Sequence, residues 1–218
     1  MSDFKISLRL REPFSGLSHL AGAFISFFGL LALVQHASMH GTLRHQISFP
    51  IFGLSLIIMY LASGIYHSLP LGEKGIKFLR RIDHIAIFIL IAGTYTPFCL
   101  VALKDHHGIF YFGLAWSMAI AGVISKIFWL ESPRWVTVSM YLGMGWISIP
   151  LAIPLSQVVA PWCLGWIAIG GLFFTSGAVI YASKRPDPYP GVFGFHEIWH
   201  LFVMAGTFSH FWAIYKYL

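Results

Sequence analysis

The feature that most constrains the fold is a series of apolar runs, each about 20 residues long and separated from the next by a short polar stretch. As an α-helix, a run of this length matches the roughly 30 Å hydrocarbon core of a bilayer. The 218-residue chain is 57% hydrophobic and only 10% charged, which excludes an ordinary soluble domain. The runs predict seven membrane-spanning helices, at residues 14–34, 50–69, 82–103, 108–130, 136–153, 162–182 and 195–215.

These runs leave little of the chain for any other structure. We therefore expect an all-α membrane protein in which a single domain, residues 1–218, forms a bundle of seven transmembrane helices. Residues 1–13 precede the first run and are predicted to form a short cytoplasmic segment. The fifth predicted helix is interrupted by glycine and proline, so we expect it to bend or break. The interrupting residues, with the proline that follows the run, are Gly143, Gly145, Pro150 and Pro154.

Lysine and arginine residues are distributed unevenly between the two sides of the predicted bundle. Of the 14 in the chain, eleven fall on the side of the amino terminus. Basic loops stay in the cytoplasm, so the amino terminus is predicted to be cytoplasmic and the carboxyl terminus external. Because these residues lie between apolar runs and not in one patch, we expect no nucleic-acid partner. The eleven are Lys5, Arg9, Arg11, Lys74, Lys77, Arg80, Arg81, Lys126, Arg134, Lys184 and Arg185.

The two cysteines, Cys99 and Cys163, are too few for a disulfide framework. We expect two ordinary buried thiols. A single bridge between them is the alternative, because both fall near the predicted outer ends of their helices.

Polar residues inside the predicted helices carry the functional prediction. An ionisable group in hydrocarbon is costly and usually faces a cavity or a partner. Here such groups gather near the predicted cytoplasmic ends of four helices, so histidines and carboxylates should share one layer of the membrane. They are Glu12, Ser15, Ser18 and His19 on the first helix, Ser63 and His67 on the second, Asp83 and His84 on the third, and His196, Glu197 and His200 on the seventh.

His196 and His200 are four residues apart, so their imidazoles project from one helix face about 6 Å apart along the axis. This spacing suits two ligands of one metal ion. His67 is predicted to be the third ligand, because Ser63 lies one turn before it and lines the same face. Three neutral imidazoles with one open position are typical of catalytic zinc, which lowers the pKa of a bound water to about 7. His210 lies about four turns beyond His196 and cannot share that ion.

Other polar residues at this depth are candidates for supporting roles. Asp83 is predicted to accept a hydrogen bond from the water or to orient a ligand, and its charge offsets that of the metal. His19 and His84 are rival ligands or residues that support the ligands, and Glu12 is a further candidate for a supporting role. The alternative is that each histidine is a hydrogen-bonded packing residue. The shared depth of His67, Asp83, His196 and His200 favours the metal.

Five short motifs together resemble the hemolysin III branch of the progestin and adipoQ receptor superfamily. Their order along nearly the whole chain is more specific than any one of them. Ser15 and Ser18 depart from this pattern, which has Asn and Thr at these positions. The motifs are EPFSGLSH at 12–19, SGIYH at 63–67, RRIDH leading into GTYTP, GMGW at 143–146, and HEIWH at 196–200.

The resemblance implies a seven-helix fold with zinc bound near the cytoplasmic side by His67, His196 and His200. It also implies that Asp83 and Ser63 lie near the metal-bound water, and that the chain resides in a bacterial inner membrane. It further connects the chain with alkaline ceramidases and related membrane hydrolases.

Two classes of function follow from these predictions. In the first, the zinc centre hydrolyses an amide or ester bond of a membrane lipid, Asp83 assists proton transfer, and zinc with Ser63 stabilises the oxyanion. In the second, the protein is not an enzyme: zinc braces the helices of a receptor-like regulator of membrane state, or the chain acts as a cytolysin or pore. Membrane lipid is the expected substrate or ligand, and nothing in the sequence indicates an oligomeric state.

Overall fold

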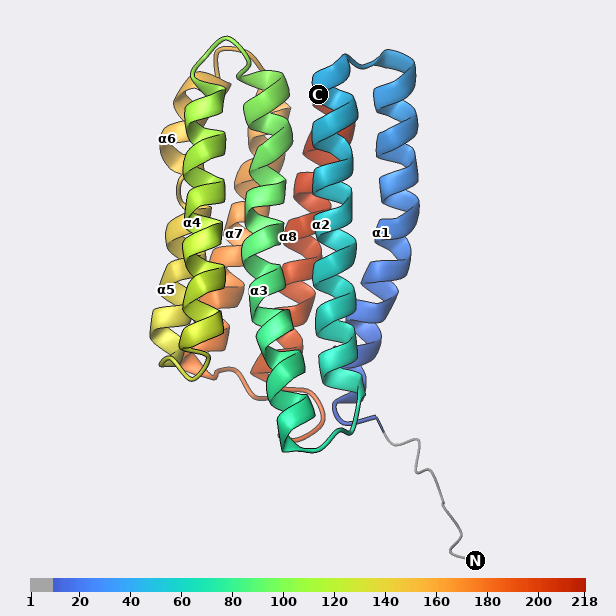
Figure 1. Cartoon of the computed structure of the whole chain (residues 1–218), viewed down its shortest axis with the longest axis vertical. Coiled ribbons are helices and arrows are strands. Elements are labelled where there is room, and N and C mark those ends of the chain that lie inside the picture. The colour runs from blue at the N-terminus through green and yellow to red at the C-terminus, as the bar shows by residue number, and fades with distance from the viewer. Residues whose placement is uncertain (1–9) are drawn as a thin grey trace, which may run out of the picture.

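The computed structural model describes residues 10–218, and all its regular elements in that range are helices that pack side by side (Figure 1). Of the predicted segment 1–13, residues 1–9 with Lys5 and Arg9 lie outside this range. The helices are α1 (Pro13–His40), α2 (Leu43–Ser68), α3 (Glu73–Pro97), the π-helix η1 (Phe98–Ala102), α4 (Gly108–Phe128), α5 (Arg134–Gly145), α6 (Ser148–Leu155), α7 (Pro161–Ser183) and α8 (Phe195–Tyr217).

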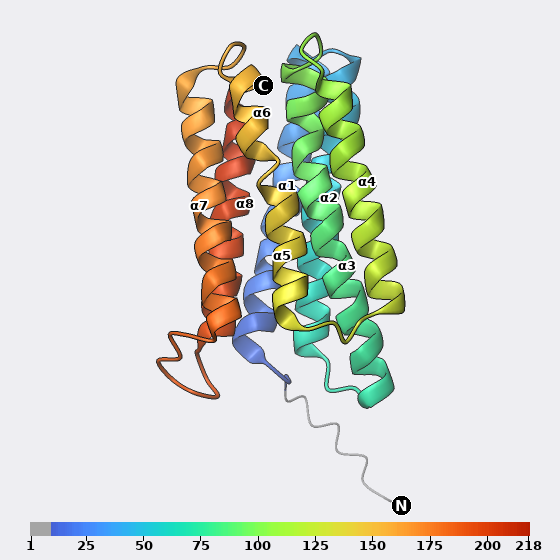
Figure 2. The ribbon, with the colours of Figure 1, turned by 90° about the vertical axis from the view of Figure 1, so that its left-hand side faces the viewer.

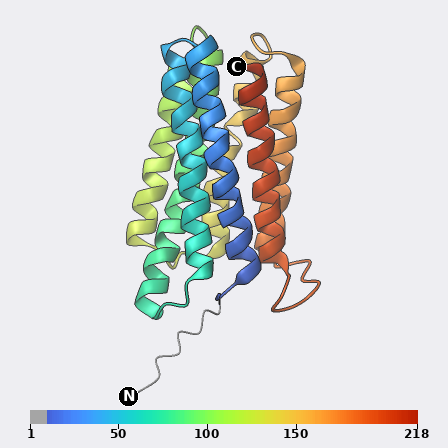
Figure 3. The same cartoon turned by 90° about the vertical axis from the view of Figure 1, so that its right-hand side faces the viewer.

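Six of the predicted membrane helices are confirmed by their length and composition. They are α1, α2, α3 with η1, α4, α5 with α6, and α7. The seventh, α8, is 23 residues long, but three histidines, Glu197 and Lys216 make it more polar than the others. It nevertheless runs along the bundle between α1 and α7 (Figure 3). A helix that packs between two neighbours can carry polar residues, because these can face the interior of the bundle.

Two predicted helix starts are wrong. Helix α2 begins at Leu43, with Pro50 inside it, and α3 begins at Glu73, so Lys74, Lys77, Arg80 and Arg81 lie on a helix and not in a loop. The error has one cause. Hydropathy detects the part of a helix that lies in hydrocarbon, whereas backbone hydrogen bonds continue the helix into the polar region beyond it.

The predicted interruption of the fifth helix is confirmed. Helices α5 and α6 stack end to end and are separated by Trp146 and Ile147 (Figure 2). A break frees backbone carbonyls that need hydrogen-bond donors. The Tyr95 hydroxyl of α3 lies 2.9 Å from the carbonyl oxygen of Met144 and 2.7 Å from that of Gly145. One side chain therefore stabilises the broken form.

The two cysteines are separate buried thiols, Cys99 in η1 and Cys163 in α7, as expected from their small number. The alternative of a bridge between them is not realised.

Gly108 offers a test of the corner between η1 and α4. A Cβ atom at this position would overlap the backbone carbonyl oxygens of Cys99 and Leu103, which cannot rotate away. We expect Gly108→Ala to destabilise the protein by about 2 kcal/mol or more, seen as a lower midpoint of thermal unfolding in detergent. Gly113→Ala is the matched control, because Gly113 is exposed in the middle of the same helix with no atom near its Cβ position. It should leave stability unchanged or raise it, and an equal loss in both variants would contradict this explanation.

Candidate metal centre

Three histidines converge at the end of the bundle where α2 ends and α8 begins (Figure 1). The Nε2 atom of His196 lies 3.4 Å from Nε2 of His67 and 3.2 Å from Nε2 of His200. His67 and His200 are each only 2% exposed, and His196 is partly buried. This three-histidine centre, His67 with His196 and His200, could hold a metal ion. It is the set selected from the sequence.

The spacing of the nitrogens fits a tetrahedral metal. Zinc binds imidazole nitrogen at 2.0–2.1 Å, so two ligands of a tetrahedral ion lie about 3.3 to 3.4 Å apart. The two Nε2 separations that involve His196, 3.4 and 3.2 Å, are close to this value, and all three ligand atoms lie within 4.8 Å of one another. The same two distances also suit hydrogen bonds in which one ring N–H donates to the next ring nitrogen, so the imidazoles need either such a proton or a cation between them. The donor set therefore suits zinc.

Glu12 fixes the tautomer of one ligand. Its carboxylate accepts a hydrogen bond from Nδ1 of His67, which leaves the lone pair of Nε2 directed at the centre. The backbone positions the same residue, because the Glu12 N–H donates to the His67 carbonyl at 2.9 Å. The other carboxylate oxygen lies 3.1 Å from Nε of Arg11. Glu12 was named from the sequence as a residue that could support the ligands. Its hydrogen bond with His67 agrees with that prediction.

Burial raises the pKa of Glu12, but the hydrogen bond from His67 and the positive charges near it outweigh this effect and hold the pKa below its ordinary value. Glu12 is therefore ionised at neutral pH. An ionised carboxylate makes the attached imidazole a better metal ligand.

Replacing Glu12 with glutamine is expected to weaken zinc binding by 10- to 100-fold without changing the number of ions bound. The amide is neutral and stabilises the imidazole less than a carboxylate does. Competition with a chelator of known affinity measures the change. Glu131→Gln provides the control, because Glu131 is an exposed carboxylate that pairs with Arg80 and Lys77. Equal zinc affinity in the parent and Glu12→Gln would show that this contact does not support the metal.

A second carboxylate near the centre is that of Glu197. This residue was predicted from the sequence to lie in the polar layer, but no role was predicted for it. It accepts a hydrogen bond from the Ser15 hydroxyl at 3.0 Å and another from the Gly194 N–H at 2.8 Å. The latter is a capping interaction that fixes the first turn of α8, which carries His196. Its signal in the sequence was a glutamate at the third position of a helix.

His19, on α1, lies against the centre without belonging to the ligand set. It is buried, and its ring stacks on that of His200 with 3.8 Å between ring centroids. His84 points elsewhere: its Nδ1 donates to the backbone carbonyl of Arg80 at 2.8 Å. It also lies 3.5 Å from the Asp83 carboxylate. The sequence predicted both His19 and His84 at the depth of the three-histidine centre. Of the two, His19 contacts a candidate ligand.

Asp83 and Ser63 are both buried, on α3 and α2 respectively. Asp83 directly precedes His84, and its carboxylate lies 3.5 Å from the Nδ1 atom of that residue. Within residues 10–218 its carboxylate accepts no hydrogen bond of good geometry, because the proton of His84 Nδ1 is directed to a backbone carbonyl. His210 is remote, as expected, and its Nε2 lies 3.2 Å from the Ile167 carbonyl oxygen.

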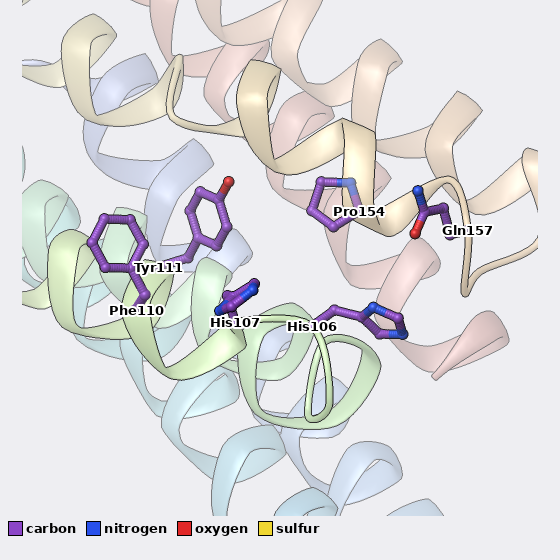
Figure 4. Close-up of a pocket in the computed structure, with 6 residues that line it drawn as sticks. All are labelled: His106, His107, Phe110, Tyr111, Pro154 and Gln157. Carbon is purple, nitrogen blue, oxygen red and sulfur yellow. The ribbon is translucent and has the colours of Figure 1, made fainter.

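A cavity of about 500 Å³ lies at the opposite end of the bundle (Figure 4). It is formed where α4 begins and α6 ends, and it shares no residue with the three-histidine centre. Its two histidines therefore add nothing to the metal ligands. The lining residues are His106, His107, Phe110, Tyr111, Pro154 and Gln157.

Comparison with known proteins gives one consistent family. Hemolysin-3 of Bacillus cereus is 33% identical over 207 residues, which cover 95% of this chain and 91% of that protein. The Hemolysin-3 homolog of Bacillus subtilis (strain 168) is 34% identical over 206 residues, or 94% and 93% of the two chains. The Monocyte to macrophage differentiation factor of Homo sapiens is 26% identical over 212 residues, covering 92% of this chain and 84% of that protein.

The matches agree with the helices. Six helices long and apolar enough to cross a bilayer make the chain a multi-pass integral membrane protein. The family model described as Haemolysin-III related matches residues 8–211, which include every residue of the centre. The chain therefore belongs to the haemolysin-III-related family, which agrees with the resemblance of its motifs.

Proposed function

We propose that the protein is a zinc-dependent hydrolase that cleaves an amide or ester bond of a membrane lipid. The observation that carries the proposal is the convergence of His67, His196 and His200, whose ligand atoms all lie within 4.8 Å of one another, with two of the three separations near the value for a tetrahedral ion. Three imidazoles leave one position of such an ion open, which distinguishes catalytic from closed structural sites. Zinc held in this way supplies an acidified water and polarises a carbonyl.

The protein's own residues supply the remaining parts of such a reaction. Asp83, whose carboxylate lies 3.5 Å from Nδ1 of His84, takes the role of general base and accepts the proton of the attacking water. The Ser63 hydroxyl, one turn before His67, donates to the carbonyl oxygen as negative charge develops on it. Glu12 orients His67 through Nδ1. Burial of the centre excludes bulk water and strengthens each of these interactions.

The depth of the centre favours a lipid substrate. We propose that α8 is a seventh membrane helix, which places the amino terminus in the cytoplasm, the carboxyl terminus outside, and the centre near the inner leaflet of a bacterial plasma membrane. The basic residues support this orientation, because Lys74, Lys77, Arg80 and Arg81 lie on α3 at the same end as the centre. The scissile bond of an inner-leaflet lipid would then lie close to the layer of the three histidines.

A receptor-like regulator with a structural metal is the competing function, since the centre also ties α2 to α8. The Bacillus relatives are named hemolysins, but lysis through a pore has less support for this chain. A pore requires a continuous polar path. Among the described residues of the other half of α8, Thr207 and Ser209 donate to carbonyls of their own helix, and His210 pairs with Ile167.

The decisive experiment is a lipid-hydrolysis assay on purified protein after metal analysis. Two probes share one acyl chain, one as the amide of a long-chain amino alcohol and the other as the ester of a long-chain alcohol, and mass spectrometry detects the released fatty acid. We expect release that stops after chelation, returns with zinc, is absent in His196→Ala and persists in His210→Ala. Bound zinc without release from either lipid would favour the structural metal instead.

A further inference from the structure

His19 lies beside the three-histidine centre. Its ring nitrogens make no hydrogen bond within residues 10–218. The residue is 3% exposed, and neither Nδ1 nor Nε2 has a hydrogen-bond partner. Its ring stacks on His200, and the ring of Tyr60 packs edge-on against it at 5.1 Å. The backbone carbonyl of His200 lies nearby but does not meet hydrogen-bond geometry. Most buried polar side-chain atoms in proteins have a partner, so this histidine requires an explanation.

A neutral imidazole has one N–H donor and one acceptor nitrogen, so it takes two partners of opposite kind. The neighbouring hydroxyl group, that of Tyr60, does not provide these partners for His19. The Tyr60 hydroxyl bonds to Thr207 Oγ1 at 2.5 Å, and Thr207 in turn donates to the Met204 carbonyl at 3.0 Å. The partners of His19 must therefore come from a ligand or from water.

The position of His19 indicates which ligand. The residue comes from α1, which provides no member of the three-histidine centre, and its stacking on His200 places it at the wall of the centre. His19 thus borders the proposed ligands from a helix that supplies none of them.

We propose that His19 binds the polar group on which the three-histidine centre acts, using one ring nitrogen as donor and the other as acceptor. The proposal rests on the proposed function, because it takes the centre to hold a metal and a lipid. It also narrows the ligand. The group must carry an acceptor oxygen together with an N–H or O–H donor, as an amide or a hydroxyl-bearing headgroup does. An ester without a hydroxyl leaves one nitrogen unpaired.

The test uses cobalt(II) in place of zinc, because its visible absorption reports both coordination and ligand binding. Octanohydroxamic acid, which carries a carbonyl oxygen, an N–H and a short acyl chain, is titrated into the cobalt-loaded full-length protein. We expect His19→Leu, which removes both nitrogens, to bind one cobalt with the parent spectrum but to bind the hydroxamate about tenfold more weakly. His19→Gln, which restores a donor and an acceptor, should recover part of this loss.

His210→Leu is the matched control, because His210 is a half-buried histidine whose Nδ1 atom is also buried and unpaired within residues 10–218, and it lies about 21 Å from His196 along α8. It should bind both cobalt and hydroxamate as the parent does. Unchanged hydroxamate affinity in His19→Leu would overturn the proposal and leave water as the partner of the ring. Loss of the cobalt spectrum in His19→Leu alone would also overturn it, since His19 would then support the metal. Absence of cobalt binding by the parent would instead refute the metal centre of the proposed function.

Discussion

Replacing His200 with alanine is expected to lower the affinity for zinc by roughly 100- to 1,000-fold. Structural zinc sites with four protein ligands bind with about 10 to 16 kcal/mol, which amounts to roughly 3 or 4 kcal/mol for each ligand. His200 is almost fully buried, so bulk solvent cannot readily take its place. Elemental analysis of the purified protein should show the zinc content falling from one ion per chain by about tenfold or more.

The same loss is expected for His67→Ala, because the centre needs ligands from both α2 and α8. His210→Ala serves as the control on α8 and should retain the metal. Full occupancy in His200→Ala, with unchanged affinity, would mean that the three histidines do not share an ion.

Replacing Asp83 with asparagine is expected to lower kcat by about 10² to 10⁴-fold while zinc content stays at the parent level. Asparagine has nearly the same shape and still accepts a hydrogen bond, but it cannot take up a proton at neutral pH. Because Asp83 is not among the three proposed ligands, the metal should remain. The measurements are zinc content and the rate of fatty-acid release on the same samples.

Asp105→Asn is the control for this variant. Asp105 is an exposed carboxylate next to Lys104, between η1 and α4, and should affect neither zinc nor rate. If Asp83→Asn kept the parent rate, Asp83 would not be the base. If it lost zinc, Asp83 would contribute to the metal centre and its assignment as a base would need to be withdrawn.

The sequence was sufficient to select the three histidines that the structure brings together. Two of them follow from helical periodicity alone, since His196 and His200 must share a face of any helix that contains both. His67 followed from depth, because a membrane restricts each residue of a span to one level. A soluble protein offers no such restriction, and the third ligand would have been harder to choose.

The contacts that support the centre were less accessible. The hydrogen bond between Glu12 and His67 joins the residue before α1 to the last turn of α2, and depth does not determine which side chains meet within a layer. The stacking of His19 on His200 depends on the rotation of α1 about its axis. Rotation is set by packing, which the apolar sequence of a membrane helix specifies poorly. The predicted starts of α2 and α3 were wrong for a different reason. Hydropathy detects only the part of a helix that lies in hydrocarbon, and both helices continue beyond it.

His67 and His196 are separated by 129 positions along the chain, which affects how the protein is made. During synthesis α2 is inserted long before α8 emerges, so the first imidazole exists for a time without the other two. Any ion that requires all three can be captured only after α8 has docked beside α1 and α2. Such an ion binds the assembled bundle and not its precursors. A higher concentration of the metal in the cell would therefore shift newly made chains toward the assembled bundle.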